Sequence, residues 1–466
     1  MRYPHSMIFM TLTISILLLS TARGEDWPKY RRDYLNTGHS AETGTLSNGV
    51  TTVNSQNISS LALKWSRSLG GKISGSPAVV AGFVYVGTWN GTMYKLDAIA
   101  GTVLAQRNLG PSSTCPSTNV TCRIGGSPMV SNGIVYIGAA KAVTNTTIAA
   151  TLYALKASDL SIAWSTPLTT QPGAEIWSSP VEFNGLVYLG VASHNDTPCV
   201  KGAVYAVNVS THAIAWTFNT LDETSCPTGT NCVGAAVWSS AAVDTANGIV
   251  YFGTGNPGSN CKPPTANATR YPDNIIALKA TSGTLMGHFQ AIANDTHDFD
   301  FGSSPVLTTT ASQSWVAESS KDGIMYFVSR SSKGIIGSPH TITIGSQLIA
   351  SPAVQLGASN NLYQPTGFGT TKGNFVKINQ SSTGSLTNQK QTFVSSSTIF
   401  SAPLMVNDVL FFGSDDFKLH AISMTGSLLW AFATNGGVDS GPAESNGRIY
   451  FGSNDGNLYA LSVGAK

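Results

Sequence analysis

A tripeptide related to Gly-Ser-Pro recurs eight times along the chain and constrains its fold more than any other feature. The copies end at residues 77, 128, 180, 241, 305, 352, 403 and 442. After most copies comes an apolar run ending in glycine, such as "FVYVG" (83–87). A run like "TLYALKA" (151–157) and a tryptophan-bearing run like "IAWSTPL" (162–168) follow. Short β-branched and aromatic runs bounded by turn residues indicate strands. Four such strands, repeated eight times, predict an all-β fold, an eight-bladed β-propeller.

The two ends of the repeat array complement each other. The last unit stops at "NLYALSVGAK" (457–466) without a tryptophan-bearing strand, whereas "LALKWSRSLGG" (61–71) precedes the first unit and has that pattern. We therefore expect this N-terminal strand to complete the last blade and close the ring, which removes an exposed sheet edge. One propeller domain would occupy residues 25–466. Residues 1–24 contain a short apolar run and are typical of a cleaved secretory signal peptide.

Charge and cysteine content narrow the functional classes. The formal net charge is +2 without a basic cluster, which argues against a nucleic-acid partner. No later segment reaches the length of about 18 apolar residues that a membrane span needs. Nine Asn-x-Ser/Thr sequons and an even number of cysteines indicate a secreted, disulfide-bonded glycoprotein. Pairing Cys115 with Cys122, Cys226 with Cys232 and Cys199 with Cys261 is one of fifteen possibilities.

Each repeat should contribute one residue per level to the wall of the central channel. The position three residues before the end of each tripeptide is occupied by Ser74, Gly125, Trp177, Trp238, Gly302, Ile349, Phe400 and Asp439. The three aromatic residues in this set fall outside the positions of the predicted blade-packing tryptophans Trp65, Trp164, Trp216 and Trp430. Two interpretations remain open: these aromatic residues form a floor for a flat conjugated ligand, or they plug the channel.

Carboxylates are concentrated in "NDTHDFDFGSSP" (294–305), although the whole chain contains only 24 Asp and Glu. The aspartates could form Asx-turns between strands, because Asp side chains often bond to the backbone two residues later. They could also supply hard oxygen ligands to a cation or act as a general base. The pattern by itself leaves the three uses open.

Several segments resemble the quinoprotein alcohol dehydrogenases, eight-bladed propellers that hold pyrroloquinoline quinone (PQQ) and a metal ion on the central axis. The repeat "VY.G…LYALD..TG...W" and the opening "DWPKYRRDYLNTGHS" (26–40) are similar to this family over nearly the whole mature chain. More specific are "GIVYFGTGNPGSN" (248–260), "DTHDFDFG" (295–302) and "SSKDGIMYFVSR" (319–330). These segments most resemble those of polyvinyl alcohol dehydrogenases and related secreted quinoproteins.

The resemblance implies catalytic and cofactor-binding residues. Asp298 would be the base that takes the alcohol's proton, and Lys321 would stabilise the reduced quinone. Trp238 would stack on the quinone, 18 residues before the metal-site asparagine. Trp177 and Arg123 would be further cofactor contacts, and Arg123 lies beside the Cys115–Cys122 segment that could cover the funnel.

The resemblance also implies a metal site for calcium or a lanthanide ion. Asn256 would be the amide ligand, and Asp298 and Asp300 the carboxylate ligands. The family's remaining ligand is a Glu, and its position falls on Asn195 in "VASHNDTPC", where Asn195 or Asp196 would have to substitute. A metal bound beside the quinone would act as a Lewis acid. The vicinal Cys-Cys pair of methanol dehydrogenases is absent, and so is a Cys-x-x-Cys-His haem site.

Two functions follow. The first is a secreted PQQ- and metal-dependent dehydrogenase that oxidises a small-molecule or polymeric alcohol, polyol or sugar and passes its electrons to an external acceptor. The alternative is a secreted, non-catalytic propeller that binds protein or carbohydrate through its loops. The combination of Trp238, Asn256, Asp298 and Lys321 favours the dehydrogenase, and the missing Glu favours the scaffold.

Overall fold

The computed structural model describes residues 24–110, 123–142, 148–193, 200–221, 234–256, 271–293, 295, 297–345, 347–367 and 372–464. In this part of the chain, eight antiparallel sheets follow one another in sequence order, which confirms the eight-bladed β-propeller. Regular helical structure among these residues is limited to one turn of 3₁₀ helix, η1 (Ile58–Ser60). No helix in the described ranges is long and apolar enough to cross a membrane.

In blades 1–7 the chain runs outwards as a meander, so the first strand of each blade is innermost. Blade 1 contains β2 (Ala78–Val80), β3 (Phe83–Gly87), β4 (Thr92–Asp97) and β5 (Val103–Asn108). Blade 2 contains β6 (Met129–Ser131), β7 (Ile134–Ala142), β8 (Ile148–Lys156) and β9 (Ile162–Thr169). Blade 3 contains β10 (Val181–Phe183), β11 (Leu186–Val191), β12 (Ala203–Asn208) and β13 (Ile214–Asn219). Blade 4 contains β14 (Ala242–Asp244), β15 (Ile249–Gly253), β16 (Asn274–Lys279) and β17 (Leu285–Gln290).

The second half of the ring follows the same plan with one departure. Blade 6 contains β23 (Ala353–Gln355), β24 (Asn360–Thr366), β25 (Asn374–Gln380) and β26 (Leu386–Val394). Blade 7 contains β27 (Leu404–Val406), β28 (Val409–Ser414), β29 (Lys418–Ser423) and β30 (Leu428–Ala433). Blade 5 contains β18 (Val306–Thr309), β19 (Ser314–Ser319), β20 (Ile324–Ser331), β21 (Gly334–Ile335) and β22 (His340–Thr343). Its outer edge differs from the predicted single strand, because β21 and β22 both pair with β20.

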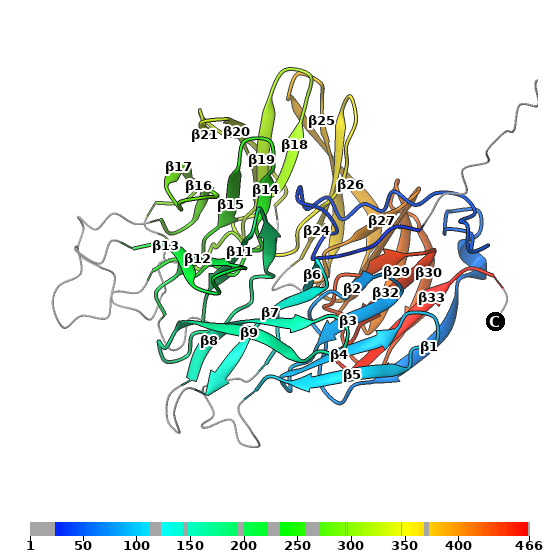
Figure 1. The fold of residues 1–466 in the computed structure, drawn as a ribbon. Helices are drawn as coiled ribbons and strands as arrows, with labels where there is room; N and C mark the ends of the chain where they lie inside the picture. Colours follow the sequence, from blue (N-terminus) through cyan, green and yellow to red (C-terminus); the bar gives the residue numbers. More distant parts are fainter. Residues whose placement is uncertain are drawn as a thin grey trace, which may run out of the picture.

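The chain ends meet in blade 8, as predicted. This blade contains β31 (Ala443–Ser445), β32 (Arg448–Gly452) and β33 (Asn457–Ser462), and its outermost strand is β1 (Ala62–Ser68). In Figure 1 the blue β1 lies beside the red β33. The pairing is antiparallel, with Ala62 opposite Ser462. The pairing covers the edge of β33 that the last repeat by itself would leave exposed, and it joins the two ends of the chain.

A glycine in the turn before the outer strand of one blade lies against the outer-strand tryptophan of the preceding blade. Trp65 of blade 8 donates its indole N–H to the Ala98 carbonyl of blade 1 (3.2 Å), and a Cβ on Gly101 would collide with its ring. Trp216 of blade 3 makes the same bond to Ala280 of blade 4 (2.9 Å). Gly101 has a φ of 66°, which glycine adopts without strain. The glycine thus makes room for the tryptophan that joins one blade to the next.

The recurring serine of the tripeptide links the inner strands around the channel. The Ser127 hydroxyl accepts a hydrogen bond from the Ser76 backbone N–H (2.8 Å), and Ser179 accepts one from Ser127 (3.0 Å). The same contact continues through Ser240, Ser304 and Ser351. The series stops at blades 7 and 8, where Ala402 and Gly441 occupy the serine position. The tripeptide is therefore an inter-blade hydrogen-bonding device.

A segment of the N-terminus, residues 27–40, contacts all eight blades and closes one end of the channel; we call it the N-terminal strap. Its backbone carbonyls accept hydrogen bonds from the inner-strand amides of Val79, Val130, Val243, Leu307, Val354 and Met405. In the two remaining blades glutamate occupies this inner-strand position. Tyr34 donates to the backbone carbonyl of Glu182 (2.9 Å), and Ser40 to the Glu444 carboxylate (2.5 Å).

Candidate functional site

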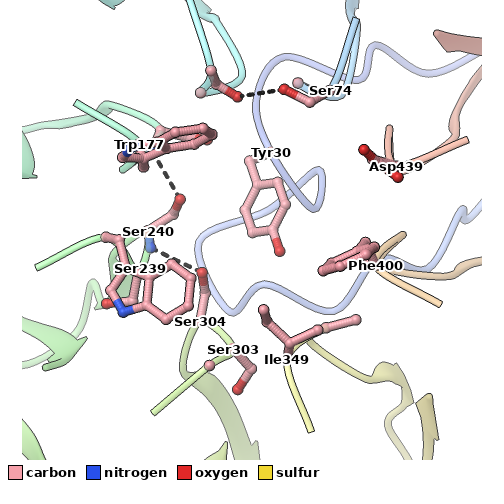
Figure 2. A pocket seen from close by; sticks show the side chains of 18 of the residues that line it. Tyr30, Ser74, Trp177, Ser239, Ser240, Ser303, Ser304, Ile349, Phe400 and Asp439 are labelled. Atoms are coloured by element: carbon pink, nitrogen blue, oxygen red, sulfur yellow. Dashed lines mark hydrogen bonds between the residues drawn. The ribbon is translucent and has the colours of Figure 1, made fainter. Parts of the chain in front are cut away.

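A cavity of about 720 Å³ lies on the propeller axis, and its wall contains all eight residues predicted to share one channel level. Figure 2 shows Trp177, Ile349, Phe400 and Asp439 around it, with Tyr30 of the N-terminal strap between them. The strap contacts the residue two positions after each tripeptide, whereas the eight channel residues stand three positions before the tripeptide's last residue. The strap and these eight residues therefore lie at different depths along the channel. The strap therefore forms the floor of a blind funnel. With so much open volume, the aromatic residues line the channel and do not plug it.

Blade 4 and blade 5 bring the predicted catalytic residues together. Lys321 Nζ lies 3.1 Å from Asp298 Oδ1 and 2.5 Å from Asp300 Oδ2. The Asn256 side-chain amide donates to Asp298 Oδ1 (3.2 Å), and its backbone N–H donates to Asp300 Oδ1. The Lys321 ammonium also lies 5.1 Å from the Trp238 ring centroid, within cation–π range. Five residues from four separate segments of the sequence thus form one cluster.

The two carboxylates of this cluster have different surroundings. The Asp300 side chain is 9% exposed, and burial raises its pKa to about 6, although the Lys321 charge opposes the shift. The Asp298 side chain is 52% exposed and lines the cavity. Asp298 has a φ of 64°, in the left-handed region that non-glycine residues seldom adopt. Asp298 can therefore contact a substrate, whereas Asp300 mainly holds the lysine.

Lys321 stays cationic in this site. Burial by itself would lower the pKa of its ammonium group, but the carboxylates of Asp300 and Asp298 outweigh that effect and raise the pKa. The side chain is 7% exposed. A permanent positive charge is therefore fixed at the edge of the cavity, where it can stabilise negative charge on a bound group.

Asp295 forms an Asx-turn, one of the three roles that the sequence leaves open for the aspartates of residues 294–305. Its Oδ1 accepts the His297 N–H and its Oδ2 accepts the Phe299 N–H, both at 2.7 Å. These bonds fold the loop that presents Asp298. The aspartates thus divide into one that shapes the loop and two that face the lysine.

Two glycines before Asn256 make room for carboxyl groups between blades 4 and 5. A Cβ on Gly253 would collide with the Glu318 carboxylate, and one on Gly255 would lie 2.8 Å from Asp300 Oδ1. Glu318 is fully buried, and burial raises its pKa well above the usual value. Asp273 is also fully buried, and burial together with the charge of Asp300 raises its pKa to about 8. Neither of these two carboxyl groups has a hydrogen-bond partner among the described residues.

Arg123 and Trp177 lie in a neighbouring cluster. The Arg123 guanidinium is 4.9 Å from the Trp177 ring centroid and 4.7 Å from that of Trp89, and it forms an ion pair with Glu175 (3.2 Å). Trp177 and Trp89 meet edge to face at 6.1 Å. Both tryptophans line the cavity, whereas Arg123 lies outside the set of lining residues. Arg123 therefore supports the aromatic wall from behind.

Sequence reasoning missed the roles of three lining residues. Trp89 follows the second strand of blade 1, and Tyr30 projects from the strap with its hydroxyl 3.1 Å from Ser351 Oγ. Asp439 is a predicted channel position to which the sequence assigns no role, although it is the acidic member of that set. The sequence could have marked Asp439 as a functional residue, because it is the one acidic residue among the eight predicted channel positions. Nothing local marks Tyr30, because its position depends on contacts with the distant blades.

Several predicted features lie outside the described residues. Asn195, the expected fourth metal position, belongs to the undescribed stretch 194–199, and all six cysteines lie in such stretches. Within the described ranges, no group of three or more His, Cys, Asp or Glu residues is placed to hold a metal ion. The oxygen-bearing side chains that converge are Asn256, Asp298 and Asp300.

Residues 27–334 match the sequence profile of the β-propeller domain of glucose, ethanol and alcohol dehydrogenases. The chain belongs to this family. Residues 369–465 match a second profile, that of the outer membrane protein assembly factor BamB. The first match covers blades 1–4 and most of blade 5, including the Asn256, Asp298 and Lys321 cluster. The resemblance noted in the sequence is therefore confirmed at the level of the family.

Individual relatives are distant. A polyvinylalcohol dehydrogenase from Sphingopyxis sp. (strain 113P3) is 23% identical over 329 residues, which cover 62% of this chain and 48% of that protein. BamB from Yersinia pestis is 28% identical over 191 residues, 40% of this chain and 43% of that protein. The chain spans about half the length of the curated relatives it matches. A europium-containing methanol dehydrogenase has the same fold, with a TM-score of 0.74, 16% identity and coverage of 94% and 98% of the two chains.

Proposed function

We propose that this protein is a secreted, PQQ-dependent dehydrogenase that oxidises an alcohol, polyol or sugar and passes electrons to an external acceptor. The observation that carries the proposal is the position of Lys321, which bridges Asp298 and Asp300 beside Trp238 at the edge of an open axial cavity. Membership of the dehydrogenase propeller family supports it. So does the activity in the names of several relatives, among them the polyvinylalcohol dehydrogenases.

The cavity residues fit a flat, anionic, conjugated quinone. Trp177 and Trp238 come from neighbouring blades, and Phe400 lies four blades from Trp177, on the opposite side of the ring. Aromatic walls suit a conjugated ligand because stacked rings gain about 0.5–1.5 kcal/mol beyond simple burial. Lys321 adds a fixed cation. PQQ, when bound, would supply the carbonyl carbon that accepts hydride from the alcohol.

The protein's own groups would handle the proton and orient the alcohol. Asp298 is exposed to the cavity. It accepts a hydrogen bond from Asn256 and forms an ion pair with Lys321, and these two contacts fix its carboxylate in place. It would take the hydroxyl proton of the alcohol at one carboxylate oxygen. A positioned general base of this kind contributes about 10²–10⁴ to the rate. The apolar faces of Trp177 and Trp238 would exclude water from the reacting carbon.

A hard cation fits the donor chemistry of the same cluster. Asn256, Asp298 and Asp300 offer carboxylate and amide oxygens, the ligands that calcium and lanthanide ions prefer. Burial raises the pKa of Asp273 and Glu318 nearby, so the negative charge available to a cation comes from Asp298 and Asp300. A bound ion would supply Lewis-acid polarisation of a carbonyl. Asn195 would complete the ligand set.

A non-catalytic scaffold is the second candidate, and the match of residues 369–465 to the BamB profile favours it. The scaffold proposal leaves the buried charges unexplained. A buried ion pair has a desolvation cost, and a scaffold that binds through its surface loops has no need of one in the axial cavity. The dehydrogenase is therefore the better-supported function.

Reconstitution tests the proposal. Purified protein is incubated with PQQ and either calcium or lanthanum, and dye reduction is followed with a panel of primary alcohols, polyols and sugars. We expect turnover that requires both PQQ and a metal ion, and that is lost in Asp298→Asn. Saturable PQQ binding without turnover on any substrate would favour a quinone-binding scaffold, and no PQQ binding would remove the quinone from this cavity.

A further inference from the structure

Asp439 occupies a distinctive place in the cavity wall. It belongs to blade 8, and in a closed ring of eight blades it lies opposite Trp238 of blade 4. Figure 2 shows it across the cavity from Trp177, beyond the ring of Tyr30. The other residues at its channel level are aromatic, aliphatic, glycine or, at position 74, serine. A carboxylate is therefore presented to the cavity on the side remote from the Lys321 cluster.

The structure around Asp439 holds its carboxylate in place. The Asn454 amide donates to Asp439 Oδ2 at 2.8 Å. Asp415 lies behind it, and burial together with the charge of Asp439 raises the pKa of Asp415 to about 6. Gly437 makes room for this second carboxyl, because a Cβ there would lie 2.5 Å from Asp415 Oδ1. Two like-charged groups kept together at a cavity wall are unfavourable for folding and are typical of binding sites.

The charges near this wall favour a neutral hydroxyl over an ammonium group. The Lys72 ammonium lowers the pKa of Asp415 and lies 5.3 Å from the Trp89 ring centroid. The Arg123 guanidinium lies over the same ring. The Lys72 charge partly offsets that of the two aspartates, so a further cation gains less there. Asp439 Oδ1 is buried and has no hydrogen-bond partner among the described residues, whereas Oδ2 accepts the Asn454 amide. A carboxylate oxygen can accept more than one hydrogen bond, so a hydroxyl donor in the cavity can bond to Oδ2 beside Asn454.

We propose that Asp439 determines substrate specificity by binding a second hydroxyl group of the substrate, remote from the one that reacts at Asp298. The proposal rests on the dehydrogenase function argued above and narrows its substrates to molecules with at least two separated hydroxyl groups, such as polyols. Asp298 belongs to blade 5 and Asp439 to blade 8, so the two carboxylates approach the cavity from different sides. A monohydric alcohol would reach only one of them.

Paired substrates provide the test. Dye reduction by protein loaded with PQQ and metal is compared for 1,5-pentanediol, erythritol and 1-pentanol, in the wild type and Asp439→Asn. Asparagine keeps an acceptor oxygen but loses the charge that makes a hydrogen bond to a carboxylate about twice as strong, which corresponds to roughly a 10-fold change. We expect KM for the diol and erythritol to rise about 10-fold or more with kcat little changed, and KM for 1-pentanol to change less than about twofold. Asp159→Asn, which alters an exposed turn of blade 2, is the matched control and should change none of these values.

A conservative variant guards against a folding defect. Asp439→Glu keeps the charge and moves it by one methylene, so we expect it to retain the preference for diols over 1-pentanol. Equal loss of activity on all three alcohols in Asp439→Asn, with normal folding, would overturn the proposal. So would a preference of the wild type for 5-amino-1-pentanol over 1,5-pentanediol.

Direct binding separates this inference from the proposed function. Ligand-observed NMR with 1,5-pentanediol is recorded on the full-length protein without an electron acceptor, for the wild type and Asp439→Asn. A signal that is lost in the variant supports the role of Asp439 even if no alcohol reduces the dye, in which case the dehydrogenase proposal alone fails. Equal signals in both proteins would overturn the role of Asp439, whatever the outcome of the activity assay.

Discussion

Lys321 and Asp300 form a buried ion pair of 2.5 Å at the edge of the axial cavity. The Lys321 backbone N–H also donates to the Asp300 carbonyl (2.9 Å), so the two residues are joined by backbone and side chain. This double connection aligns the start of β20 with the loop that carries Asp298. The ion pair thus positions the loop of Asp298, the proposed catalytic base, and keeps a cation beside it.

Breaking this pair should destabilise the fold. In Lys321→Gln the Asp300 carboxylate would remain buried without its cation, a situation that costs about 3–5 kcal/mol. The loss should grow as the pH rises from 5 to 8, because an unpaired Asp300 folds best when protonated. Urea unfolding of the wild type and the variant at pH 5 and pH 8 measures this loss of stability. The double variant Lys321→Gln with Asp300→Asn, which has no unpaired charge, should recover most of the stability; no recovery would contradict this account.

Asp298→Asn should separate catalysis from binding. The amide cannot accept the alcohol's proton, so kcat should fall by about 10²-fold or more. The side chain is half exposed and keeps its shape, so the melting temperature and PQQ affinity should stay close to those of the wild type. Stopped-flow dye reduction and fluorescence titration give the two values. If turnover persists in this variant, the base lies elsewhere.

Trp238→Ala should weaken quinone binding. The indole faces the cavity beside Lys321, and its loss removes a stacking surface and a cation–π contact. We expect the PQQ dissociation constant, measured by quenching of tryptophan fluorescence, to rise at least about 10-fold. Trp430→Phe, on the outer strand of blade 7, is the control and should leave PQQ affinity unchanged. Equal affinity in wild type and Trp238→Ala would exclude stacking at this position.

The N-terminal strap should be tested at Asn36. This fully buried side chain donates to the Pro305 carbonyl (2.9 Å) and the Ala241 carbonyl (3.1 Å), and accepts from Lys29 Nζ (2.7 Å). Asn36→Ala would remove all three bonds from buried groups, and each buried group left unsatisfied costs about 1–3 kcal/mol. We expect a lower free energy of unfolding in urea. Asn48→Ala, an exposed turn residue outside the strap, should have little effect.

Asp273 should make the protein less stable as the pH rises. The folded-state pKa is about 8, above the usual value of 3.8, so between these values the native state binds a proton that the unfolded state does not. Stability therefore falls as the pH increases through this window. Asp273→Asn cannot titrate, so it should gain up to about 4 kcal/mol relative to the wild type between pH 5 and pH 8. Parallel unfolding curves at the two pH values would show that this carboxyl is not held protonated.

The repeat by itself determines the eight-bladed architecture. The eight tripeptides, the glycine-ended strands and the orphan strand at 61–71 predict the blades and the closure of the ring, because each signal lies within one repeat. The resemblance to the quinoprotein family likewise predicts Asp298, Asn256 and Lys321 as site residues. Each of these residues stands in a short segment whose local sequence identifies it.

The tertiary structure decided what no single segment encodes. Asp295 and Asp298 are three residues apart in one loop, yet Asp295 bonds to the backbone of that loop and Asp298 to Lys321 in the turn between β19 and β20. Ser40 and Glu444 are 404 positions apart, and their hydrogen bond exists only because the ring closes. The opposition of Asp439 and Trp238 across the axis likewise follows from blade order. Local pattern fixes the strands, whereas contacts between blades depend on how the closed ring brings distant residues together.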